Sequence, residues 1–267
     1  MDNQAQLLFA KSYQLRNRLK RIQLALGPME ERSGLCIGPV PMALRARLMA
    51  IGGDWSFSGA ADGRLPFRDG SFDRVVLLDH LEMVPDDYAF LADVHRVLKT
   101  AGILFVDVEN RKRWTFWCPL RRLFGVGERA ESRVRPGYTE RELFDLLKDG
   151  FDLQEARTYS RFFVEGIETL QRLALGAFVG GMSASSEEDA EEDDTIAGRI
   201  ARIQAISYPF FLLAAKLDWL LFYTHGYRLY AIARRRLWKP RRTPKLRDGR
   251  TLADATLNTK IGTAAPF

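Results

Sequence analysis

The sequence predicts an α/β protein: a doubly wound, mostly parallel sheet followed by a helical C-terminal extension. Three observations predict it. From residue 34 onward, short apolar strands alternate with helices, as they do in parallel sheets built from right-handed crossovers. Phe72–Asp79 (FDRVVLLD) has contiguous rather than alternating apolar residues, which is typical of a strand buried on both faces. The most apolar segment, residues 206–223, comes after the last predicted strand.

Length and composition agree with this class and exclude several others. The chain has 267 residues, of which 46% are hydrophobic and 28% charged, so it is no collagen, coiled-coil rod or wholly disordered chain. Two cysteines, Cys36 and Cys118, exclude a disulfide scaffold and fit a reducing compartment. Three histidines without paired Cys or His spacing predict no metal site. Because the N-terminus places apolar residues before basic ones, the reverse of a signal peptide, we expect a cytoplasmic protein.

Residues 1–28 form the first predicted unit, an amphipathic helix that Gly27-Pro28 ends. A lid packed on the next domain is favoured over an independent membrane-binding helix. Basic residues fall mostly on its other faces. The apolar stripe consists of Leu8, Leu15, Leu19, Ile22 and Leu26.

Residues 29–160 form the second unit, the α/β domain. A helix over Pro85–Lys99 has Asp86 near its N-cap, and Thr139 with Glu142 is a capping-box signature for a later helix. Met42–Met49 is a further helix. The predicted strands are Gly34–Ile37, Trp55–Ser58, Phe72–Asp79, Ile103–Val108 and Phe151–Thr158.

Residues 161–238 form the predicted helical extension, with an acidic loop at 183–194. A transmembrane helix over 206–223 is disfavoured by Pro209, Lys216 and Asp218. A core helix and an interfacial helix both remain open. The basic residues that follow, within 234–242, favour a membrane surface over a solvated tail, so region 206–247 is expected to bind a membrane surface or a protein complex.

Residues 239–267 complete the chain as a basic, extended tail. Since the basic tail from 234 to 250 holds a single aromatic, Trp238, no specific nucleic-acid partner is expected.

Ligands of open parallel sheets bind at the carboxyl ends of the strands, so the strand ends are the candidate site. Three ends stand out: Gly38, the pair Asp62-Gly63, and the pair Asp79-His80. Asp79 or His80 is a candidate general base for a hydroxyl acceptor. The alternative for Asp79 is a cap on the following loop, and for His80 a structural or solvent-facing role.

The run LPFRDGSFDRVVLLDHLEMVPDDYAFLADVHRVLKTAGILFVDVEN, Leu65 to Asn110, resembles class I S-adenosylmethionine-dependent methyltransferases. The LPF-x-DGSFD signature and the helix ending HRVLK before a glycine carry the resemblance. It implies a Rossmann-like sheet and S-adenosylmethionine as cofactor, with Gly38, Asp62, Gly63 and Asp79 in the binding site. Asp62, before LPF, matches the acid that contacts the adenine amine.

The sequence also departs from that family. Its first-strand motif reads Leu35-Cys36-Ile37-Gly38-Pro39-Val40-Pro41-Met42, in which only Gly38 matches a family glycine. Cys36 stands where the family carboxylate belongs, and a β-branched Val40 at a close-approach position is expected to force the loop aside. The stretch from Ile37 to Leu65 has room for one helix and one strand, so the sheet is shortened between its first and fourth strands.

Two functions follow from the resemblance and the departures. The first is a methyltransferase whose acceptor is a lipid or a lipid-linked glycan, peripheral on the inner face of the membrane. The alternative is a catalytically inactive methyltransferase-fold subunit that binds a protein complex or a membrane surface.

Overall fold

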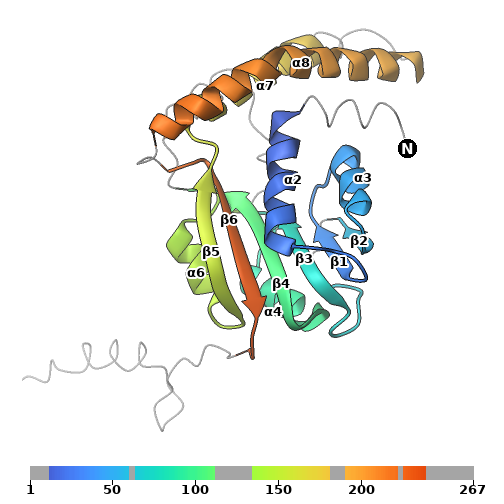
Figure 1. Cartoon of the computed structure of the whole chain (residues 1–267), viewed down its shortest axis with the longest axis vertical. Helices are drawn as coiled ribbons and strands as arrows, with labels where there is room; N and C mark the ends of the chain where they lie inside the picture. The colour runs from blue at the N-terminus through green and yellow to red at the C-terminus, as the bar shows by residue number, and fades with distance from the viewer. Residues whose placement is uncertain (1–11, 60–63, 112–133, 181–189, 222–224, 239–267) are drawn as a thin grey trace, which may run out of the picture.

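The structure, a computed structural model, describes residues 12–59, 64–111, 134–180, 190–221 and 225–238. Six strands form one sheet in the order β2-β1-β3-β4-β6-β5 (Figure 1). The strands are β1 (Ser33–Ile37), β2 (Asp54–Ser58), β3 (Phe72–Leu78), β4 (Leu98–Glu109), β5 (Phe151–Tyr159) and β6 (Arg228–Arg235).

The sheet is mostly parallel, as predicted. β1 pairs in parallel with β2 and β3, and β3 pairs in parallel with β4. β6 runs antiparallel to both β4 and β5, so among these six strands it alone points the other way. The carboxyl ends of the other five strands therefore lie along one edge, where β6 begins.

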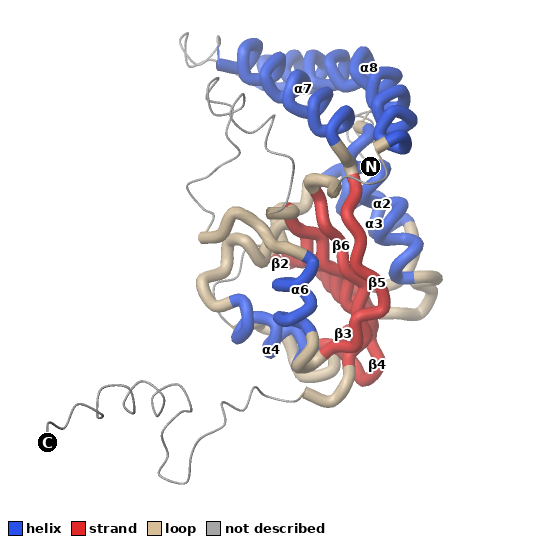
Figure 2. The backbone as a smooth tube through the Cα atoms, turned by 90° about the vertical axis from the view of Figure 1, so that its left-hand side faces the viewer, coloured by secondary structure: helices blue, strands red, loops and turns tan. Residues whose placement is uncertain are grey.

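Helices cover both faces of the sheet. Figures 1 and 2 show α2 and α3 on one face, α4 and α6 on the other, and α7 and α8 beyond the carboxyl edge. The helices are α2 (Tyr13–Leu26), α3 (Met42–Ala50), α4 (Asp87–Val97), α6 (Glu140–Leu147), α7 (Phe162–Gly180) and α8 (Ala190–Leu220). In the described ranges, no helix combines the length and the apolar character that a bilayer crossing requires.

The contiguous apolar residues of β3 supply both layers of the core. Val75 and Leu77 point into the cluster under α4 and α6, while Val76 and Leu78 point into the cluster under α2 and α3. All four side chains are fully buried. The prediction that this strand is buried on both faces is confirmed.

Local signals also placed several helix ends correctly. Asp86 caps α4 by accepting a hydrogen bond from the Ala89 amide, 2.9 Å away. The capping box of α6 is complete, since Thr139 and Glu142 each accept a hydrogen bond from the other's backbone amide. Helix α2 ends at the Gly27 cap and buries Leu19, Ile22 and Leu26 against the sheet, as expected for a packed lid.

Strand β6 corrects the prediction that residues 161–238 form a helical extension, in which no strand was expected. Residues 228–235 form a strand in the interior of the sheet, between β4 and β5, with Leu229, Ala231 and Ala233 fully buried. The pairing of β6 with β4 joins segments more than a hundred residues apart, which no local pattern encodes. The short apolar run RLYAIA suits a buried strand as well as a helix.

The acidic loop predicted at 183–194 is wrong at its end, because α8 already begins at Ala190. Its residues 183–189, like the predicted tail at 239–267, lie outside the described residues. The helix predicted over Pro85–Lys99 ends at Val97, and β4 follows it directly.

Candidate functional site

A cavity of about 440 Å³ lies at the carboxyl edge of the sheet. Its walls are the turn after β1, the residue after β3, the junction of β5 with α7, the start of β6 and the first turns of α2. The lining residues are Gln14, Leu15, Asn17, Arg18, Pro39, Pro41, Asp79, Met83, Tyr159, Ser160, Glu168, Tyr227 and Arg228.

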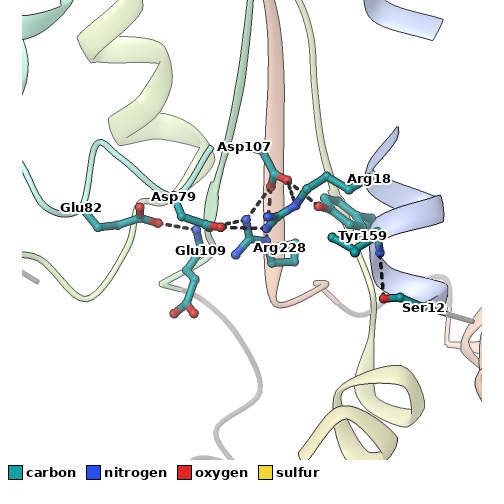
Figure 3. A network of polar contacts seen from close by, with 9 residues as sticks. Ser12, Arg18, Asp79, Glu82, Asp107, Glu109, Tyr159 and Arg228 are labelled. Atoms are coloured by element: carbon teal, nitrogen blue, oxygen red, sulfur yellow. Dashed lines mark hydrogen bonds and ion pairs between the residues drawn. The ribbon is translucent and has the colours of Figure 1, made fainter. Parts of the chain in front are cut away.

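A network of charged side chains forms the floor of this cavity (Figure 3). Arg18 of α2 reaches Asp79 through Nη2 and Asp107 of β4 through Nε, both at 2.9 Å. Arg228 of β6 bonds the same two carboxylates, and its Nη2 lies 2.9 Å from Asp107 Oδ1. The Tyr159 hydroxyl donates to Asp107 Oδ2 over 2.8 Å. Two guanidiniums and two carboxylates therefore balance each other at the strand ends.

Electrostatics keeps both guanidiniums of this network protonated. Burial lowers the pKa of Arg228, but the attraction of Asp107 and Asp79 outweighs burial and raises that pKa well above its ordinary value. The pKa of Arg18 rises in the same way, with Asp79 as the strongest attraction. Burial, together with Asp107, raises the pKa of the Tyr159 hydroxyl, which therefore stays protonated and able to donate.

Glu82 lies buried beside the network, and sequence reasoning did not select it. Its Oε1 accepts a hydrogen bond from the Glu109 amide at 2.6 Å, so it joins the ends of β3 and β4. Burial, reinforced by the negative charge of Asp79, raises the pKa of Glu82 to about 7.

Replacing Glu82 by glutamine is expected to flatten the pH dependence of stability. The folded protein holds the Glu82 proton up to about pH 7, whereas the unfolded chain releases it near 4.5. Folding therefore binds a proton in this window, and the free energy of unfolding falls as pH rises, by about 3 kcal/mol in all. Chemical denaturation at about pH 4.5 and about pH 8 measures the fall in both proteins. Glu140→Gln, an exposed change on α6, is the control, and parallel profiles for wild type and Glu82→Gln would contradict the assignment.

The predicted site residues separate into three groups. Asp79 lines the cavity, with its carboxylate held between Arg18 and Arg228. His80 is buried, its ring 4.8 Å from that of Phe90, and it is not among the residues that line the cavity. Asp62 and Gly63 lie outside the described residues, so their predicted role is untested.

Gly38 has a packing reason to be glycine. Its φ is +124°, and a Cβ built on it would lie 2.0 Å from the carbonyl oxygen of Leu78. Val40, expected to force the loop aside, is instead buried in the core under α2 and α3. Pro39 and Pro41 face the cavity in its place. Cys36 is buried as well, and burial raises the pKa of its thiol to about 12.

Sequence reasoning missed Arg18 and Arg228. The sequence predicts basic residues mostly on the outer faces of this helix, yet Arg18 lies three residues after Leu15 and four before Ile22, on the inner face. That spacing was the available signal. Arg228 had none, because its strand was read as helix. Within the described residues, no group of three or more Cys, His, Asp or Glu side chains is arranged to hold a metal ion.

Comparisons with known proteins give one family match and several similar structures. Residues 44–106 match the family model described as a methyltransferase domain. The [4+2]-cyclase SpnF has a similar structure, with a TM-score of 0.50 and 18% identity over 85% of this chain and 83% of that one. An S-adenosylmethionine-dependent methyltransferase from Thermotoga maritima aligns with a TM-score of 0.41 and 13% identity, over 85% of this chain and all (100%) of that one. Another, from Methanosarcina mazei, aligns with a TM-score of 0.37 and 23% identity, over 52% and 88%. No curated protein was found to match the chain.

The match over residues 44–106 and the likeness of the whole fold to SpnF agree with the methyltransferase-like α/β fold that the resemblance in sequence implied.

Proposed function

We propose that this protein is a methyltransferase that binds S-adenosylmethionine in the cavity at the carboxyl edge of the sheet. One observation carries the proposal: the cavity opens where β1 and β3 end, and its floor presents paired guanidinium and carboxylate groups. This is the edge at which open parallel sheets bind their ligands.

The residues present fit the amino-acid half of the cofactor. The planar guanidiniums of Arg18 and Arg228 suit a carboxylate, and the carboxylates of Asp79 and Glu168 suit an ammonium group. The adenosine half would extend toward the end of β2 at Ser58, beyond which residues 60–63 lie outside the described part. When bound, the cofactor supplies a methyl group on a positively charged sulfur.

The chain's own contribution would be positioning and proton removal. Arg18 holds Asp79 Oδ2 and Arg228 holds Oδ1, so the carboxylate is fixed at the cavity wall. Each carboxylate oxygen has two acceptor sites, which leaves Asp79 able to accept a hydrogen bond from the cofactor or from an acceptor hydroxyl. Tyr159 orients Asp107 beneath it.

Replacing Asp79 by asparagine is expected to weaken S-adenosylmethionine binding at least tenfold, since a charge-assisted hydrogen bond is worth about 1.5–3 kcal/mol. Calorimetry with S-adenosylmethionine and S-adenosylhomocysteine measures it. The matched control is Asp152→Asn, an exposed residue at the far end of β5. If the wild type binds S-adenosylmethionine and Asp79→Asn binds it equally strongly, the cofactor does not contact Asp79 and binds elsewhere.

We propose that the methyl acceptor is a lipid or a lipid-linked glycan, which the protein reaches at the cytoplasmic face of the membrane. The support is α8, which packs on the helix that carries Glu168 and exposes a row of large apolar side chains. Transfer of a labelled methyl group to the organic phase of a cell-envelope extract tests this. Label that stays in the aqueous phase would point to a different acceptor.

A second candidate is a catalytically inactive methyltransferase-fold subunit of a complex or membrane surface. The observation that favours it is Gly38, whose missing side chain makes room for Leu78 rather than for a ligand. A folded protein that binds neither S-adenosylmethionine nor S-adenosylhomocysteine at millimolar concentration would establish this alternative.

A further inference from the structure

Helix α8 is held on the molecule by one face. Phe211 and Ala214 are almost fully buried, and the Phe211 ring stacks on Tyr13 of α2 with centroids 5.3 Å apart. Asp218 is also buried, and its carboxylate accepts hydrogen bonds from the amides of Arg161 and Phe163, both at 2.8 Å. Asp218 thus caps the start of α7, which explains a charge in an otherwise apolar segment. These contacts fix which face of α8 points outward.

The outward face is apolar and basic. Its central row of exposed positions follows helical spacing, three or four residues apart: 202, 206, 210, 213, 216 and 220. Arg202 and Lys216 are exposed on this face. Within residues 202–221 the one acidic residue is Asp218, and its side chain points inward. The exposed large apolar residues are Ile206 (68%), Phe210 (56%), Leu212 (45%), Leu213 (56%), Trp219 (74%) and Leu220 (59%).

We propose that this face of α8 docks on the surface of a membrane that contains anionic lipid. An apolar strip that carries cations and no acid is the pattern of helices that lie in the interface plane, where the strip enters the acyl boundary. The two cations would then meet lipid phosphates. The positive charge of this face therefore favours an anionic lipid surface as its partner.

A second copy of the chain fits this face less well. An antiparallel pair of α8 helices centred on Pro209 would bring Arg202 of one copy opposite Lys216 of the other, because both lie seven residues from Pro209. A parallel pair would set each cation against itself. Both arrangements oppose like charges in an apolar interface.

The basic residues at 234–236 are not part of this surface. Strand β6 begins at the carboxyl edge and carries them to the opposite edge of the sheet, away from α8 (Figure 1). There Arg235 donates to the Leu98 carbonyl, and the Arg236 amide donates to the carbonyl of Gly150. Residues 206–221 and 234–236 thus do not form one continuous patch, and the proposed docking face belongs to α8.

Sedimentation of the full chain with vesicles tests the proposal. The wild type is expected to bind phosphatidylcholine vesicles that contain phosphatidylglycerol and to bind pure phosphatidylcholine at least tenfold more weakly. The double variant Phe210→Asp, Leu213→Asp is expected to bind the anionic vesicles at least tenfold more weakly than wild type. Leu24→Asp makes the same change at an exposed position of α2 and is expected to bind as wild type. Arg202→Gln with Lys216→Gln is expected to reduce the salt dependence of binding.

Circular dichroism establishes that each variant is folded, and Trp219→Ser replaces the double variant if that variant unfolds. Wild-type binding by a folded α8 variant would overturn the proposal, and so would equal binding to both kinds of vesicle. A wild-type dimer that the double variant dissociates would show that a second copy covers the face instead. Calorimetry with S-adenosylmethionine is a separate readout, so loss of vesicle binding and loss of cofactor binding are distinguishable.

Discussion

Replacing Gly38 by alanine is expected to lower the free energy of unfolding by more than about 3 kcal/mol, or to prevent folding. The added Cβ would lie 2.0 Å from the Leu78 carbonyl oxygen, a backbone atom in the sheet interior. β1 and β3 are paired up to Ile37 and Leu77, so Leu78 cannot withdraw without disturbing the pairing. The φ of +124° adds conformational strain that alanine cannot relieve.

The control for Gly38→Ala is Gly52→Ala. Gly52 has a φ of +97° and nothing within 4 Å of a Cβ, so it isolates the conformational cost, expected to be about 1 kcal/mol. Chemical denaturation of both variants gives the difference. A Gly38→Ala protein that folds with near wild-type stability but loses S-adenosylmethionine binding would reverse the interpretation, since the glycine would then serve the cofactor and not the sheet.

Features that depend on residues close together in the chain, such as helix caps, were predicted correctly from the sequence. Asp86 before α4 and Thr139 with Glu142 before α6 act through hydrogen bonds that span three residues, and each was predicted. The contiguous apolar residues of β3 predicted burial on both faces because a strand must then find a helix layer on each side. Asp79 was selected for the same local reason, as the residue at the carboxyl end of the predicted strand Phe72–Asp79, directly after Leu78 of β3.

The cavity floor could not be predicted in this way. Asp107, Arg18 and Arg228 come from β4, α2 and β6, and no local pattern links them. Their meeting depends on the antiparallel pairing of β6, which places Arg228 opposite Glu109 at the carboxyl edge. A pairing between distant segments is decided by the whole sheet, so a prediction that treated 228–235 as helix lost both the strand and the site residue at its start.

Replacing Arg228 by methionine is expected to cost about 3–5 kcal/mol of stability, because it removes one of the two cations that pair with the buried Asp107 carboxylate. Asp107 is fully buried, and in this variant Asp79 and Asp107 would share Arg18 as their cation. Two carboxylates beside one guanidinium repel each other in a region of low dielectric. Urea denaturation near neutral pH measures the loss.

Two further variants separate this mechanism from a simple loss of packing. Arg157→Met removes an ion pair with Glu155 that is largely exposed on the Arg157 side, and it is expected to cost less than about 1 kcal/mol. Adding Asp107→Asn to Arg228→Met removes the excess negative charge, so the double variant is expected to be more stable than the single one by at least about 1 kcal/mol. If the double variant is instead less stable, by the sum of its two substitutions, then Arg228 acts through its packing, and the charges at the carboxyl edge do not stabilise the fold as a network.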